Sequence, residues 1–199
     1  MRNLAAGRVF LIGLTLAAMA GAAAAATQAA PTHDPAKQAT VVKILDNLGA
    51  YDLLVFGSKQ GFQTDDGFKT LPAGDQTLLL SLMTEELGKR RQALLNDMAS
   101  TDCDAFTTDQ LKDLLAMSKI KYVHDLMMSK GDPSRPAPDP ASMTASEKAL
   151  YDRLDQATFA GDFLNNIGYN NAVDDLKAAD QAAIDRYKAA KAAPGKAAS

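Results

Sequence analysis

The amino-acid sequence predicts an all-α protein. Apolar residues recur at three- and four-residue steps along most of the chain, which is the spacing of one face of a helix. No run of alternating Val, Ile or Thr indicates a half-buried strand. We expect an antiparallel three-helix unit over residues 34–130, a Pro-rich linker over 131–142 and a helical hairpin over 143–187, followed by a disordered tail over 188–199.

Residues 1–26 have the features of a cleaved signal peptide. Arg2 and Arg8 accompany an uncharged apolar run, and small residues follow it and end in Ala24-x-Ala26. Because the run is short and rich in Ala, we expect no stable membrane anchor after cleavage. Residues 27–33 are expected to be a flexible start, and the mature protein to be periplasmic or secreted.

Charge and cysteine content exclude several classes of function. Loss of Arg2 and Arg8 with the signal peptide changes the formal net charge of −3 to about −5, so we expect no nucleic-acid partner, which would need a clustered basic surface. Cys103 is the single cysteine, so no internal disulfide can form. Its flanking residues Asp102 and Asp104 should raise the thiol pKa, which disfavours a nucleophilic role. We expect a half-buried small apolar residue there, with an intermolecular disulfide as the alternative.

The first two helices are expected on either side of a loop. Asp34 as N-cap and Pro35 at the first helical position begin a helix expected over 35–57. A stretch rich in Gly and Pro predicts a loop over 57–75, and the second helix should occupy 75–100.

Two charged residues lie close to the apolar stripes of these helices. Asp52 falls next to the stripe of the first helix, and Arg91 falls inside the stripe of the second. An ion pair between them would satisfy both charges, and separate solvation at the edges of the stripes is the other interpretation.

The third helix has the strongest local signal. In Phe106-Thr107-x-x-Gln110-Leu111, Thr107 and Gln110 form a capping box, and Phe106 can pack on Leu111 as a hydrophobic staple. The expected core face comprises Leu111, Leu114, Leu115, Ser118, Tyr122 and Leu126.

The same stretch carries a family resemblance. Phe106, Thr107, Leu111, Leu114, Leu115 and Ala116 match the repeat Phe-Thr-x-x-x-Leu-x-x-Leu-Leu-Ala. In this respect residues 98–130 resemble the exported proteobacterial domain-of-unknown-function family 2059. The resemblance implies an exported helical protein and no defined activity.

The C-terminal part begins after four prolines within residues 131–142, which predict a semi-rigid extended linker. A second capping box, Thr144-x-x-Glu147, starts the expected hairpin. A break near residues 168–171 should separate its two helices.

One group of residues could bind a metal. His124 and Met128 form an i, i+4 pair on the third helix, and Met117 and Met127 lie along the same side. Imidazole and thioether ligands suit Cu(I). Methionine is also a common filler of helical cores, so the preferred interpretation is that this face is buried against the C-terminal hairpin.

The sequence favours binding over catalysis. His124 is the only histidine outside the flexible start, so groups for acid–base or nucleophilic chemistry are scarce, and no cofactor is expected. The leading hypothesis is an exported non-catalytic helical binding or interaction protein. It would use a groove between its two helical units for a peptide, a protein partner or an apolar small molecule. Periplasmic copper handling by His124 and the methionines is the alternative, and an enzyme comes third.

Overall fold

A computed structural model describes residues 34–100, 103–165 and 167–192. Within these ranges all regular structure is helical, which confirms the all-α class. The predicted signal peptide (1–26) and flexible start (27–33) lie outside the described residues. No helix in the described part of the chain is long and apolar enough to cross a membrane.

The first two expected helices are each divided. The elements are α1 (Pro35–Asn47), α2 (Ala50–Thr64), α3 (Asp66–Lys69), α4 (Ala73–Lys89) and α5 (Arg91–Ala99). The predicted cap is confirmed, because the Asp34 carboxylate accepts hydrogen bonds from the first amides of α1. The prediction of continuous helices over 35–57 and 75–100 is wrong, because the helical conformation is interrupted at Gly49 and at Arg90. The loop predicted over 57–75 is also too long, because α2 continues to Thr64.

The third expected helix is divided as well. It comprises α6 (Thr108–Ser118) and α7 (Lys121–Gly131), preceded by the short helix η2 (Cys103–Ala105). The capping box of Thr107 and Gln110 is confirmed. Between α6 and α7 the backbone of Ile120 is extended, with ψ 118°. The core face is confirmed for Leu111, Leu114 and Ser118, which are buried, whereas Leu115, Tyr122 and Leu126 are only half-buried.

The C-terminal part differs most from expectation. Its elements are η3 (Pro140–Ser142), α8 (Ala145–Asp155), α9 (Thr158–Asn165), η4 (Tyr169–Ala172) and α10 (Val173–Ala192). The second capping box, at Thr144 and Glu147, is confirmed. The expected hairpin over 143–187 is wrong, because α10 packs along α4 instead of returning along α8 and α9. The tail expected to be disordered is helical over 188–192, and residues 193–199 lie outside the described part.

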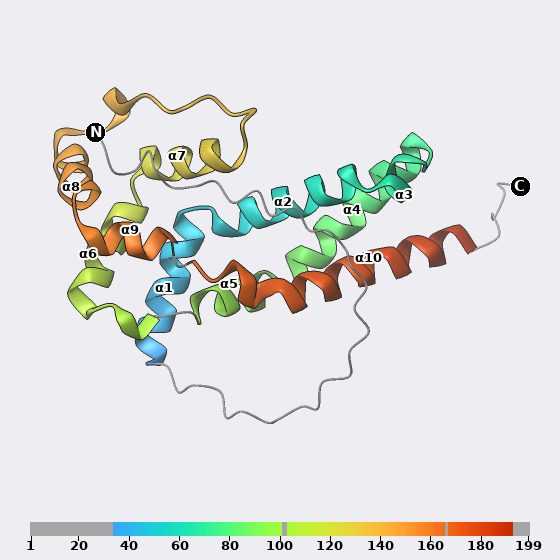
Figure 1. The fold of residues 1–199 in the computed structure, drawn as a ribbon, viewed down its shortest axis with the longest axis horizontal. Helices are drawn as coiled ribbons and strands as arrows, with labels where there is room; N and C mark the ends of the chain where they lie inside the picture. The colour runs from blue at the N-terminus through green and yellow to red at the C-terminus, as the bar shows by residue number, and fades with distance from the viewer. Residues whose placement is uncertain (1–33, 101–102, 166, 193–199) are drawn as a thin grey trace, which may run out of the picture.

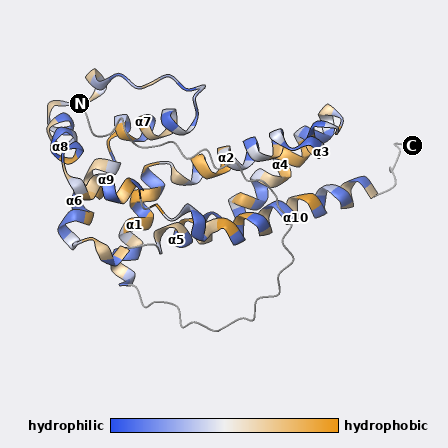
Figure 2. Cartoon of the chain, viewed as in Figure 1, coloured by the Kyte–Doolittle hydropathy of each residue, from blue (hydrophilic) through white to orange (hydrophobic). Residues whose placement is uncertain are grey.

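The helices share one apolar core. Figure 1 shows α2, α4 and α10 extending together toward the end of the molecule that carries α3. At the other end α1 packs against α5 and α6, and α6 packs against α8. Figure 2 shows hydrophilic and hydrophobic residues alternating along α10, as expected for an amphipathic surface helix. The most completely buried large residues are Ile44, Leu45, Leu48, Met83, Leu87, Leu94, Met98, Leu111, Leu114 and Leu154.

Arg91 has a different partner from the one considered. Its guanidinium donates to the Asp46 carboxylate at 2.5 Å and lies 4.5 Å from the ring centroid of Tyr51. Asp52 raises the pKa of Arg91 only as a weaker, more distant charge. The pair therefore links α5 to the end of α1, at a half-exposed site where an ion pair stabilises by at most about 1 kcal/mol.

Two of the helix breaks lie against each other. Gly49, between α1 and α2, is buried and has a left-handed backbone with φ 75°. A β-carbon at Gly49 would lie 2.7 Å from Met128 Sδ and 3.1 Å from His124 Nε2, so α7 packs directly on this glycine. Next to it, the Asn47 amide donates to Ser118 Oγ at 3.1 Å, which ties the end of α1 to the end of α6.

We expect Gly49→Ala to destabilise the protein. Alanine disfavours the left-handed backbone by about 1 to 2 kcal/mol, and its β-carbon would also displace Met128. The control is Gly57→Ala in α2, where a β-carbon meets no atom within 4 Å. That change should stabilise by about 0.5 to 1 kcal/mol, because Gly is a poor helix former. Urea unfolding measures the free energy of unfolding of both variants. If Gly49→Ala proves as stable as Gly57→Ala, the prediction is contradicted.

Candidate functional site

His124 and Met128 are brought together by α7. The imidazole Nε2 and the thioether Sδ both lie over Gly49, where α1 gives way to α2. Met128 is buried, and the His124 side chain is 36% exposed. The expected burial against the C-terminal hairpin is therefore wrong for this pair, because their neighbour is the α1–α2 break.

The hydrogen bonding of His124 leaves one ring nitrogen available. Its Nδ1 lies 3.2 Å from Asp125 Oδ1. Lys121, followed by His124, lowers the pKa of the Asp125 carboxyl, so this carboxyl is ionised and can only accept. The proton of a neutral imidazole therefore belongs on Nδ1, and Nε2 has a free lone pair. A carboxylate behind the ring orients metal-binding histidines in the same way.

Met117 and Met127 occupy a different environment. Met117 is buried within the main apolar core, and Met127 is half-buried and packs against that core. The contact of α7 with the C-terminal part comes from Tyr122, whose ring meets that of Tyr151 edge-on at 5.4 Å between centroids. Of the four predicted ligands, the structure thus places His124 and Met128 over the same glycine and gives the two others packing roles.

Other metal and nucleophile chemistry finds little support in the described residues. Within the described ranges, no three His, Cys, Asp or Glu side chains come close enough to hold a metal ion. Cys103 is completely buried. Burial, and after it the Asp104 carboxylate, raises the pKa of the thiol, so the thiolate is disfavoured as expected.

A small depression lies between α8 and the junction of α6 with α7. Its volume is about 220 Å³, and it is lined by Ala116, Lys119, Ile120, Ser146, Glu147 and Leu150. Ile120 is buried and Leu150 half-buried, which makes the depression partly apolar, while Lys119 is exposed. The Glu147 carboxylate accepts from the Thr144 amide at 2.8 Å and the Thr144 hydroxyl at 2.7 Å. These bonds lower the pKa of Glu147 and fix one wall of the depression.

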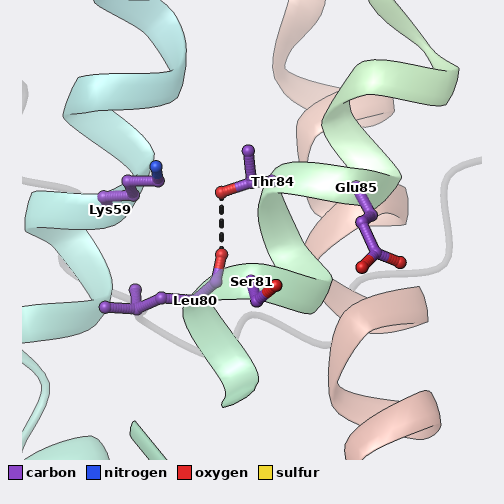
Figure 3. Close-up of a pocket in the computed structure, with 5 residues that line it drawn as sticks. All are labelled: Lys59, Leu80, Ser81, Thr84 and Glu85. Carbon is purple, nitrogen blue, oxygen red and sulfur yellow. Dashed lines mark hydrogen bonds between the residues drawn. The ribbon is translucent and has the colours of Figure 1, made fainter. Parts of the chain in front are cut away.

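A larger depression, of about 430 Å³, lies between α2 and α4 (Figure 3). Lys59 lies on the α2 side, and Leu80, Ser81, Thr84 and Glu85 lie on the α4 side. The Thr84 hydroxyl donates to the Leu80 carbonyl at 2.8 Å (Figure 3). Glu85 accepts from Arg186 of α10 at 2.8 Å.

Sequence reasoning missed the α2–α4 depression for an identifiable reason. Gly57 and Gly61 indicated a loop, yet both are helical residues of α2 and carry Lys59 between them. The four- and three-residue steps from Val55 to Lys59 to Phe62 continue the apolar stripe only if the lysine stem is counted as apolar, and this weak signal could have extended the predicted helix.

Comparison with known proteins was carried out at three levels. The chain matches no family model, no curated protein and no solved structure. The resemblance of residues 98–130 to the exported family therefore stays a prediction.

Cys103 should be inert in the folded protein. A maleimide or a disulfide reagent needs an accessible thiolate, and burial removes both access and charge. We expect labelling within minutes in denaturant and almost none at neutral pH without it, as measured by intact mass. Rapid labelling of the native protein would contradict the burial of Cys103 at the start of η2.

Proposed function

We propose that the mature protein is an exported, non-catalytic interaction protein that binds a segment of a partner protein between α6–α7 and α8. The observation that supports this proposal is the partly apolar depression at the seam between the first helical unit and the C-terminal part. Export rests on the predicted signal peptide over 1–26, and the resemblance of residues 98–130 agrees with an exported helical protein.

The size and lining of this depression favour a peptide segment as the occupant. Its volume of about 220 Å³ is below that of typical small-molecule pockets, which is about 300 to 1,000 Å³. The depression can instead take one large apolar side chain against Ile120 and Leu150, as interface anchors do. Lys119 has an exposed ammonium at the rim and can bind a carboxylate. The proposed partner segment therefore carries a Leu, Phe or Met close to an Asp or Glu.

Selection from a random twelve-residue peptide library on the mature protein tests this proposal. We expect enriched peptides to share a large apolar residue near an acid, and to bind at least about tenfold more weakly to Leu150→Arg, because the arginine removes the apolar contact and fills the depression. Fluorescence anisotropy of purified peptides measures this difference.

The matched control is Leu80→Arg, which places the same charge in the α2–α4 depression on another face. Peptides that lose binding to Leu80→Arg but not to Leu150→Arg would move the site to α2–α4. No enrichment above the background of an unrelated helical protein would contradict the proposal.

Periplasmic copper handling is the second candidate, supported by the position of His124 Nε2 and Met128 Sδ over the same residue, Gly49. The free lone pair of Nε2 and the thioether Sδ lie on the same side of α7, and Asp125 orients the ring from behind. Met117 and Met127 would have to leave their core packing to add further ligands.

Anaerobic Cu(I) titration against a competing chelator tests this candidate. If the site binds copper, His124→Leu and Met128→Leu should each weaken binding by at least about tenfold, which is the effect expected for loss of one ligand from a small site. Met143→Leu is the control, because it removes a half-buried methionine outside α7. Equal binding by all three variants, or none by the intact protein, would eliminate copper handling through His124.

A further inference from the structure

The docking of α10 depends strongly on charged groups. The fully buried residues of this helix are two alanines, Ala179 and Ala183, and its larger apolar residues Leu176, Ile184 and Tyr187 are only half-buried against the core. Around them, Arg186 donates to Glu85 and Glu86 at 2.8 Å, and the Tyr187 hydroxyl donates to Asp75 at 3.0 Å. The remaining ion pairs are Lys191 with Asp75 at 2.5 Å and Arg90 with Asp175 at 3.0 Å.

Asp180 is the exception in this interface. Among the described residues, its Oδ1 is buried and has no hydrogen-bond partner. In the same part of the chain, the charged groups that face α10 are Asp75, Glu85 and Glu86 of α4, Arg90 between α4 and α5, and Asp97 of α5, while η4 carries the phenol of Tyr169. The pairs described above commit the groups of α4 to Arg186, Tyr187 and Lys191, and Arg90 to Asp175. An ionised Asp180 is therefore desolvated without compensation, which makes the docked position of α10 less favourable.

A second carboxyl contact has the same consequence. Asp97 of α5 lies next to Asp175 of α10, and Asp175 is the residue that binds Arg90. One arginine cannot fully neutralise two carboxylates, so their repulsion opposes docking when both are ionised. A proton on either carboxyl converts the repulsion into a hydrogen bond.

We propose that α10 is a pH-dependent latch, held most tightly against α4 and α5 when Asp180 and one carboxyl of the Asp97–Asp175 pair are protonated. This inference goes beyond the proposed binding function and does not depend on it. Opening of the latch would expose the apolar residues Leu79 and Met83 of α4, which are buried in the docked state.

The direction of the pH effect on docking follows from the raised pKa values of Asp180 and Asp97. Burial raises the pKa of Asp180 to about 6, and burial followed by Asp175 raises the pKa of Asp97. The contribution of these carboxyls to the docking free energy is thus fully present below the ordinary Asp pKa of about 4 and is lost as the pH rises through about 6. Lys191 lowers the pKa of Asp75 and Lys89 lowers that of Glu86, so the ion pairs of these residues persist throughout this range.

Hydrogen exchange of the mature protein, followed by mass spectrometry and corrected for intrinsic rates, tests the latch. Between pH 5 and pH 7.5 we expect protection of the α10 amides to fall by at least about tenfold, since one pKa unit corresponds to a tenfold change in equilibrium. The amides of α1 in the same sample should change much less, because α1 belongs to the core formed with α5 and α6.

The variant Asp180→Asn keeps the shape of the side chain and removes its charge. It should raise α10 protection at pH 7.5 and remove most of the pH dependence. Asp185→Asn is the control, because Asp185 is exposed on the same helix and, within the described part of the chain, accepts a hydrogen bond from Gln181 one turn earlier. Wild-type pH dependence in Asp180→Asn, or equal loss of protection in α1 and α10, would overturn the latch.

Discussion

The packing of α7 on Gly49 is the constraint on which the rest of the structure depends. Because Gly49 has a left-handed backbone and no side chain, α1 can end and α2 can begin in a new direction with Met128 directly above the junction. The bond between Asn47 and Ser118 fixes the neighbouring α6–α7 break to the same point. From this junction α1 extends between α5 and α6, and α2 extends along α4.

The same arrangement creates the proposed binding site. The break between α6 and α7 places Ile120 under the depression and Lys119 at its rim, and α8 supplies the opposite wall through a segment fixed by its capping box. The copper alternative depends on the same junction, since His124 and Met128 are held there by packing on Gly49.

The two ends of the molecule are stabilised by different forces. Around α1, large aliphatic side chains exclude water, and such burial changes little with pH. Along α10, buried alanines and half-buried larger apolar residues lie among ion pairs and among carboxyls that have no compensating charge in the described part of the chain. An interface of the second kind is sensitive to protonation, so the pH dependence of the protein should be concentrated in α10.

The sequence by itself determined the helical class, the N-cap at Asp34 and the capping boxes at Thr107 and Thr144. Each cap joins groups at most three residues apart, so local sequence contains all the information needed. Only the tertiary structure decided the helix breaks, the pairing of Arg91 with Asp46, and the position of α10 on α4. The hydrogen bond from Arg91 to Asp46 joins residues 45 positions apart, and that from Arg186 to Glu85 joins residues 101 positions apart. Periodicity within one helix carries no information about which distant surface will cover it.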